Sequence, residues 1–177
     1  MATGRTILIL AASMAFLVAE GALAQGKSSF ETGDFTGWNV QGKGWSIYAK
    51  DASDGSKSAM CTVSKGEPAG GVMACAKVIK AQPGFVVKVD LDLVGKAKKR
   101  SSRVKISVIC VDAAGNILQE VEKKVAVPPS EFQTVSVPEL IVPAKTAETY
   151  VMLMVEVAKP VKSTEWWRFD NVRIQVK

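Results

Sequence analysis

The sequence predicts an all-β protein folded as a β-sandwich, and two observations support this. Between Phe85 and Val94, apolar and polar residues alternate strictly. A period of two is typical of a strand with one buried and one solvated face. About nine short runs of this kind are separated by turn residues, which is the spacing of a sandwich. None of these runs has a helical period.

The first residues have the features of a secretory signal peptide. Arg5 precedes an apolar run from Ile7 to Ala19, and small residues stand at Ala22 and Ala24. The alternative is a retained membrane anchor, but the run is short of the roughly 20 residues that a span needs. We therefore expect cleavage near Ala24, a domain division of 1–24 and 25–177, and a secreted or periplasmic protein. The remaining 177 − 24 = 153 residues suit one domain, and we expect no transmembrane segment among them.

The expected strands follow one another along this single domain. Turns rich in Asp, Gly and Pro separate them, since these residues accept tight backbone angles. The expected ranges are 44–49, 58–64, 72–80, 85–94, 104–111, 117–127, 132–137, 150–158 and 166–176.

The composition excludes several kinds of catalytic site. The sequence contains no histidine, which removes Ser-His-Asp and Cys-His catalysis and zinc sites built on imidazole. Asp90 and Asp92 share a strand face, as paired glycosidase carboxylates could, but acids on an outer strand face are common. We therefore predict that the protein is not an enzyme. The formal net charge of +6 permits an acidic polysaccharide, and export makes nucleic acid an unexpected partner.

The three cysteines allow two interpretations. Cys61 and Cys75 lie seven residues to either side of Pro68. In a simple hairpin they would stand opposite each other, and exported proteins favour disulfides. We therefore predict a Cys61–Cys75 bridge, with Cys110 as a core thiol. The alternative is three buried free cysteines.

Several segments resemble the galactose-binding-like jelly-roll domains, which include the carbohydrate-binding modules of bacterial polysaccharide-degrading enzymes. These segments are Phe30-Glu31-Thr32-Gly33 with Trp38, the turn 54–59, the hairpin 112–116, the segment 131–137 and the closing Phe169-Asp170-Asn171-Val172. The resemblance implies a jelly-roll sandwich of two antiparallel sheets, a role in binding a polysaccharide or glycan without catalysis, and often a structural calcium. The alternative is a structural or assembly module that binds a surface protein, because the fold does not determine the ligand.

The same resemblance suggests residues for the calcium. Glu31 and Asp170 would supply side chains, carbonyls near Ser29 and Lys50 would complete the shell, and Asp34 or Asp51 is a possible addition. Calcium prefers such oxygen ligands. The alternative is that these acids are solvated or paired with a neighbouring arginine.

Candidate sugar-binding residues come from the outward faces of the expected strands. Sugars stack on aromatic rings flanked by polar groups. Trp166 points outward if Trp167 points inward, and Tyr150 points away from the apolar face of its strand. We expect one cleft that combines these rings with polar side chains, or else an ordinary polar surface with an exposed ring. The polar set is Lys88, Asp90, Asp92, Lys105, Ser107 and Glu156. If the protein instead binds protein, we expect an apolar patch at Tyr150, Met152 and Met154.

The densest charge run is Lys96 to Arg103, which includes Lys98, Lys99 and Arg100. At a loop tip these residues could bind the acidic groups of a polymer with a strong dependence on salt. The alternative is a solvated loop that prevents strand pairing.

Overall fold

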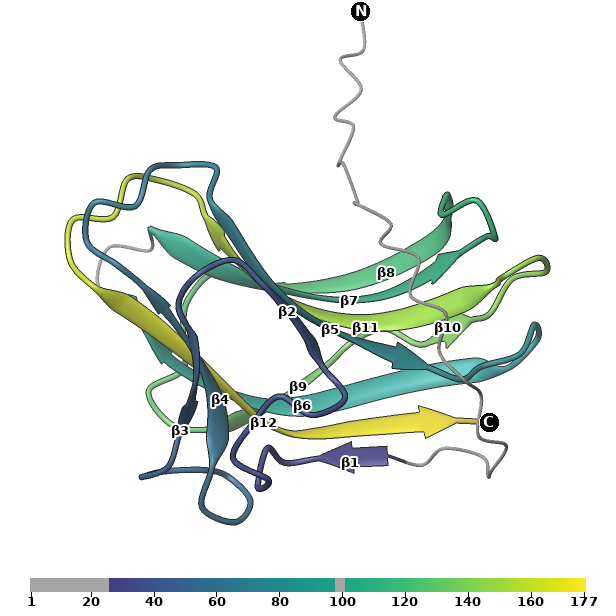
Figure 1. Cartoon of the computed structure of the whole chain (residues 1–177), viewed down its shortest axis with the longest axis horizontal. Coiled ribbons are helices and arrows are strands. Elements are labelled where there is room, and N and C mark those ends of the chain that lie inside the picture. The colour runs from purple at the N-terminus through teal and green to yellow at the C-terminus, as the bar shows by residue number, and fades with distance from the viewer. Residues whose placement is uncertain (1–25, 98–100) are drawn as a thin grey trace, which may run out of the picture.

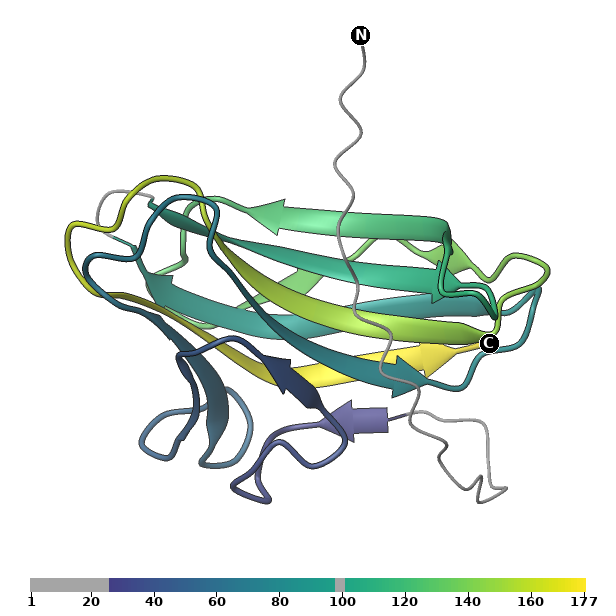
Figure 2. The same ribbon diagram turned by 45° about the horizontal axis from the view of Figure 1, so that its top comes forward.

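The computed structural model describes residues 26–97 and 101–177, which form two antiparallel sheets packed face to face (Figure 1). The seven-stranded sheet has the order β10 (Leu140–Ile141), β6 (Val86–Lys96), β12 (Glu165–Val176), β4 (Ser58–Val63) and β3 (Trp45–Tyr48). In the same sheet, β1 (Gly26–Ser28) pairs with β12 and β9 (Gln133–Ser136) pairs with β6. The five-stranded sheet has the order β2 (Asn39–Gln41), β5 (Val72–Ile79), β11 (Glu148–Val157), β7 (Ser102–Val111) and β8 (Ile117–Val125), and the turned view of Figure 2 shows the layer of β5, β11, β7 and β8.

The core lies between the sheets and follows the predicted alternation. In β6, Val87, Val89, Leu91 and Leu93 are fully buried. From β12, Trp167 and Phe169 contribute the largest fully buried side chains. Burial of such large apolar surfaces is the main stabilising term of a fold of this kind. The predictions that Trp167 points inward and that Trp166 points outward are therefore confirmed.

The two ends of the described chain lie side by side, as Figures 1 and 2 both show. Residues 26–28 of β1 pair antiparallel with residues 172–174 of β12. A jelly-roll sandwich of two antiparallel sheets is therefore confirmed. Three strands were not predicted, namely β1, β2 and β10, because two or three residues are too short to show a period. None of the described residues belongs to a helix that could cross a membrane. The proposed signal peptide lies outside the described residues.

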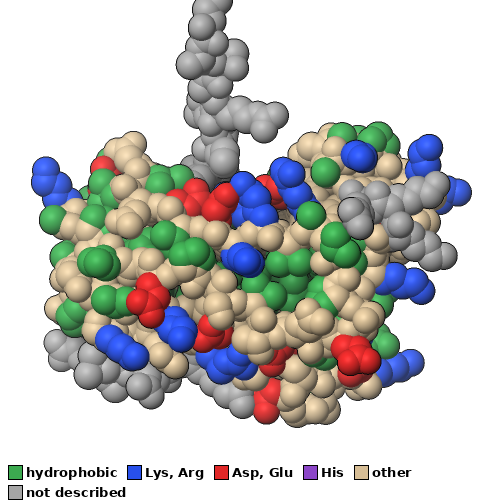
Figure 3. All heavy atoms as spheres, turned by 180° about the vertical axis from the view of Figure 1, so that it is seen from behind, with side chains coloured by type: hydrophobic (Ala, Val, Ile, Leu, Met, Phe, Trp, Pro, Cys, Tyr) green, Lys and Arg blue, Asp and Glu red, His purple; other side chains and the backbone are tan. Residues whose placement is uncertain are grey.

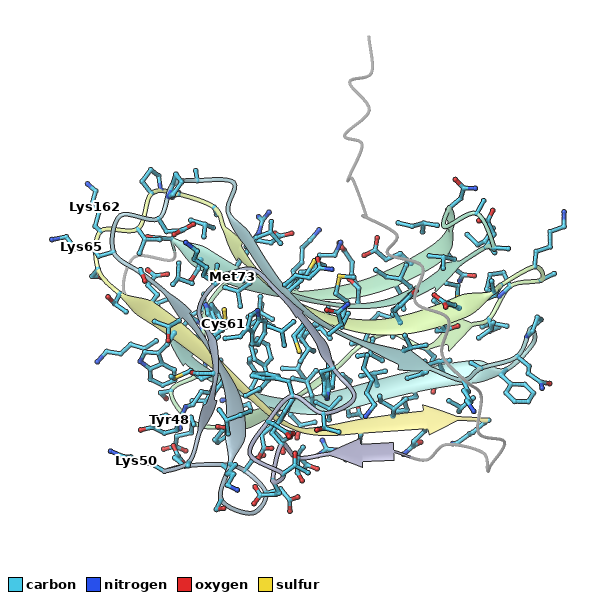
Figure 4. All side chains as sticks on the ribbon, viewed as in Figure 1. Tyr48, Lys50, Cys61, Lys65, Met73 and Lys162 are labelled. Atoms are coloured by element: carbon cyan, nitrogen blue, oxygen red, sulfur yellow. The ribbon has the colours of Figure 1, made fainter. Side chains whose placement is uncertain are left out.

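The predicted Cys61–Cys75 bridge is wrong in this structure, because the hairpin on which it depended does not form. Cys61 lies in β4 of one sheet and Cys75 in β5 of the other. All three cysteines are free and buried, and burial raises the pKa of the Cys61 and Cys75 thiols to about 12. The Cys61 Sγ instead approaches the Met73 Sδ at 3.7 Å, and Figure 4 shows these two side chains facing each other.

Candidate functional site

The predicted cleft does not form, because its residues belong to opposite outer faces of the sandwich. Lys88, Asp90, Asp92 and Trp166 lie on β6 and β12 of the seven-stranded sheet. Lys105, Ser107, Tyr150 and Glu156 lie on β7 and β11 of the five-stranded sheet. Alternation along one strand distinguishes inward from outward residues, but it does not say to which sheet the strand belongs.

On the outer side of the seven-stranded sheet, three aromatic rings surround one arginine. The Arg168 guanidinium carbon lies 4.7 Å from the ring centroid of Tyr48, 4.8 Å from that of Trp166 and 5.4 Å from that of Phe132. The rings come from β3, from β12 and from the residue before β9, so the group spans the sheet. We call Tyr48, Phe132, Trp166 and Arg168 the aromatic face. Each ring is partly exposed, whereas only 9% of the Arg168 side chain is exposed.

Arg168 is fixed in place by the loop that follows β3. Its Nη2 pairs with the Asp51 carboxylate at 2.7 Å, and its Nη1 donates to the Asp51 carbonyl oxygen at 3.2 Å. A guanidinium held over ring faces is stabilised by cation–π attraction. The result is a preorganised surface of half-exposed rings, with the partly exposed Asp51 carboxylate beside it. Such a surface suits a ligand with flat C–H faces and hydroxyl groups.

Asp92 lies at the centre of a polar network farther along the same face. Thr134 Oγ1 donates to its Oδ1 at 2.7 Å and Asn171 Nδ2 to its Oδ2 at 3.0 Å, and Arg173 Nη2 pairs with Oδ1 at 3.3 Å. Burial alone would raise the pKa of Asp92, but these hydrogen bonds outweigh it and hold the pKa at about 2. Asp92 is therefore a structural anion that supports β6, β9 and β12.

Replacing Asp92 with asparagine should make stability less dependent on pH. The lowered pKa of Asp92 stabilises the folded state above the unfolded value of 3.8, and this contribution is lost as the pH falls through about 2. At pH 7 we expect the variant to be less stable by about 2 kcal/mol. Urea unfolding should show that the difference in free energy of unfolding between the two proteins is smaller near pH 2.5 than at pH 7. An equal difference at both pH values would contradict this role.

The two other predicted residues of this sheet lie away from the rings. Lys88 and Asp90 stand opposite Gln175 and Arg173 in the register of β6 with β12, whereas Trp166 stands opposite Lys96. The Lys88 Nζ lies 3.9 Å from the Asp90 carboxylate. Of the ligand-binding residues predicted on this sheet, Trp166 is therefore the one that lies in the aromatic face.

The outer face of the five-stranded sheet offers one ring and several ion pairs. The Tyr150 hydroxyl donates to Glu148, and burial and this carboxylate raise the pKa of Tyr150 to about 12. Lys105 pairs with Glu120 and Glu122 at 2.7 and 2.9 Å, and Arg103 pairs with Glu156 at 2.7 Å. Met152 and Met154 lie half-buried on the same face, beside exposed Val72 and Val78. The charged groups here are largely engaged with one another.

Glu31 and Asp170 meet on one loop, residues 51–57, which we call the clamped loop. Asp170 Oδ2 accepts hydrogen bonds from the Ser53 and Asp54 backbone N–H groups at 2.8 and 2.9 Å, and from Ser53 Oγ at 3.0 Å. Glu31 Oε1 accepts from the Ser56 and Lys57 N–H groups at 2.9 and 2.7 Å. Backbone hydrogen bonds, that from Lys57 foremost, lower the pKa of Glu31, whereas burial raises the pKa of Asp170. The two acids thus join residues from both ends of the chain through this loop.

The fit of a calcium ion to this region differs between the two acids. Asp170 Oδ1 is buried and has no hydrogen-bond partner, so it offers an anionic oxygen for a cation. The Glu31 carboxylate is already bound by the clamped loop, and the Glu31 carbonyl oxygen accepts from Lys57 Nζ at 2.9 Å. Within the described ranges, no cluster of three or more His, Cys, Asp or Glu side chains is arranged to hold a metal.

The basic run is described only at its ends, because Lys98, Lys99 and Arg100 lie outside the described residues. Lys96 is exposed at the end of β6, and Ser101 is buried just before β7. The predicted contribution of the three central residues to binding remains a prediction.

Comparisons with solved structures place this arrangement of strands among known folds. One similar structure is the CBM22-1 xylan-binding domain of Paenibacillus barcinonensis Xyn10C, which is 17% identical with a TM-score of 0.62 and covers 88% of this chain and 97% of that domain. Another is TmCBM61, solved with β-1,4-galactotriose, which is 19% identical with a TM-score of 0.57 and covers 84% of this chain and 94% of that one. This chain has the jelly-roll fold of those modules. The resemblance inferred from the sequence is therefore confirmed for the fold.

The same fold also occurs within a larger enzyme. The enzymatically active domain of tailspike protein 4 of bacteriophage CBA120 matches 84% of this chain with a TM-score of 0.64 and 13% identity. This chain spans only 20% of that protein. No family model and no curated protein matches the sequence.

Sequence reasoning missed three residues of the aromatic face, although one signal was present. Arg168 has the same parity as Trp166 in β12, so both should point outward once Trp167 is assigned to the core. Tyr48 and Phe132 carry no such signal, because their approach to Arg168 depends on the order of strands in the sheet.

Proposed function

We propose that this protein is a non-catalytic module that binds a polysaccharide on the aromatic face. The observation that carries the proposal is the Arg168 guanidinium held between the partly exposed rings of Tyr48, Phe132 and Trp166. The rings supply apolar surfaces for the C–H faces of sugar units. Asp51 accepts hydrogen bonds from hydroxyl groups at the side of the rings. The likeness to carbohydrate-binding modules supports the proposal through the fold.

Affinity electrophoresis of the chain from residue 25 onward tests this proposal. Gels that contain xylan, β-1,4-galactan or polygalacturonate should retard the protein relative to a gel without polymer. We expect retardation by at least one of these polymers, or by another polymer from a broad glycan array. Migration unchanged by every polysaccharide, at low salt as well as at physiological salt, would overturn the proposal.

A second candidate function, binding of a surface protein, is favoured by the apolar outer face of the five-stranded sheet. Val72 and Val78 are 54% and 56% exposed there. Val78 stands opposite Tyr150 in the register of β5 with β11, whereas Val72 stands opposite Glu156, beyond Met152 and Met154. Light scattering after size exclusion tests it for self-association. A stable oligomer that dissociates on Val78→Lys substitution would favour this function. If the unsubstituted protein and the variant are both monomers, such self-association is excluded.

We also propose that a structural calcium ion is held at Asp170 Oδ1. An ionised buried oxygen without a donor is costly, and a cation would remove that cost. The ion would stabilise the clamped loop without taking part in chemistry. Thermal unfolding with calcium should give a higher Tm than with a chelator, and Asp170→Asn should abolish the difference. An equal Tm with calcium and with chelator in the unsubstituted protein would contradict the calcium site.

A further inference from the structure

One end of the sandwich carries a set of lysines from separate segments. Lys65 follows β4, Lys96 ends β6, and Lys159 and Lys162 lie between β11 and β12. All four are exposed. We call them the basic end. Figure 4 shows Lys65 and Lys162 projecting at the same end of the molecule. In Figure 3, which views the molecule from behind, this end is on the right of the picture and carries several Lys and Arg side chains.

The backbone beneath the basic end is firmly connected. The Gly66 N–H donates to the Val161 carbonyl at 2.9 Å, and the Val161 N–H donates to the Glu67 carbonyl at 3.0 Å. The N–H groups of Ala158 and Lys159 both donate to the Ser101 carbonyl, at 2.7 and 3.1 Å. Three segments that are distant in sequence are thus held together, so the lysines are presented by a fixed frame.

A shallow, open hollow of about 420 Å³ lies on this frame and is lined by Ser101, Lys159, Pro160 and Lys162. None of the ion pairs between described residues includes a lysine of the basic end. The buried Glu165 carboxylate nearby accepts from the Ser102 N–H and hydroxyl groups, at 2.9 and 2.6 Å. The positive charge of the basic end is therefore left for an external anion.

The basic end continues into the aromatic face. Trp166 stands directly opposite Lys96 in the register of β12 with β6, so the two residues are cross-strand neighbours. Arg168 follows Trp166 on the same outer face of β12, and Tyr48 contacts Arg168 from β3. A polymer that stacks on the rings would therefore reach the lysines within the length of a few sugar units.

We propose that the polysaccharide is anionic, with carboxylate or sulfate groups that bind the basic end while its sugar rings stack on the aromatic face. The inference rests on the proposed function and specifies the class of its ligand. A lysine ammonium is a flexible point charge, which suits anionic groups repeated along a polymer.

Binding of polygalacturonate, dextran sulfate and neutral β-1,4-galactan at several NaCl concentrations tests the inference. For at least one anionic polymer we expect the Kd to rise by about tenfold between 50 and 500 mM NaCl, because salt screens exposed charges. The double variant Lys159→Glu with Lys162→Glu should weaken that binding by a further factor of about ten. Its binding of any neutral glycan should change less than about twofold.

A matched control separates the site from the overall charge. Lys123→Glu with Lys145→Glu makes the same change in charge at exposed positions away from the basic end. Retained binding by this control, with loss in the Lys159/Lys162 variant, would support the inference. Equal loss in both variants would overturn it, as would tighter binding of single-stranded DNA that displaces the glycan. Binding of neutral glycans alone would overturn the inference and leave the proposed function standing, whereas binding of no glycan would overturn both.

Discussion

Replacing Asp170 with alanine is expected to destabilise the protein by about 3 kcal/mol. The carboxylate is fully buried and accepts three hydrogen bonds from Ser53 and Asp54. Its removal leaves two part-buried backbone N–H groups of the clamped loop without their partner. An unsatisfied donor costs about 1–3 kcal/mol when it is fully buried, and less where water reaches it. The estimate is below the sum of the three bonds, because burial raises the pKa of Asp170 and so opposes its ionised form. Thermal unfolding with a chelator present should show Tm lower by about 6–12 °C.

Two further variants make the expected result specific to the clamp. Glu31→Ala removes an exposed carboxylate that accepts from the neighbouring N–H groups of Ser56 and Lys57, so it should lower Tm in the same direction but by less. Asp170→Asn keeps one acceptor oxygen and should lie between alanine and the unsubstituted protein. A Tm for Asp170→Ala within 2 °C of the unsubstituted protein would refute the clamp.

Replacing Trp166 with alanine is expected to weaken polysaccharide binding by about tenfold, or about 1.4 kcal/mol. The indole is the largest ring of the aromatic face, and it lies beside both Arg168 and Lys96. The double substitution of Trp166 and Tyr48 by alanine should remove measurable binding, because Phe132 alone would remain to stack. Affinity electrophoresis or calorimetry on a polymer that the unsubstituted protein binds measures both effects.

Controls separate loss of the ligand site from loss of the fold. Trp166→Phe keeps a ring and should retain most of the affinity. Tyr150→Ala removes a ring of similar exposure from the outer face of the five-stranded sheet and should change Kd by less than about twofold. If Tyr150→Ala abolished binding while Trp166→Ala preserved it, the ligand site would belong to the five-stranded sheet.

The fold could be predicted from the sequence because its signals are local. The alternation of Val87, Val89, Leu91 and Leu93 identifies a core strand without any knowledge of its neighbours. The placement of Trp167 in the core followed from the same parity argument. The pairing of Cys61 with Cys75 failed, because it required a hairpin where the chain crosses from one sheet to the other.

The candidate site was less accessible to sequence reasoning because it depends on the order of strands in the sheets. Tyr150 and Trp166 were expected in one cleft, yet they lie on opposite faces of the sandwich. The resemblance to known modules provided the prediction that Glu31 and Asp170 share a calcium site, and this stays a prediction. Their observed role is to bind backbone N–H groups of the clamped loop, which composition and spacing do not reveal.

Chemical-shift mapping by NMR during titration with an oligosaccharide fragment of a bound polymer tests the central proposal most directly. The account predicts that the largest shifts fall on the Trp166 indole N–H, the Tyr48 ring and the Arg168 guanidinium. Shifts that cluster instead on Tyr150, Met152 and Ala76, on the outer face of the five-stranded sheet, would contradict it.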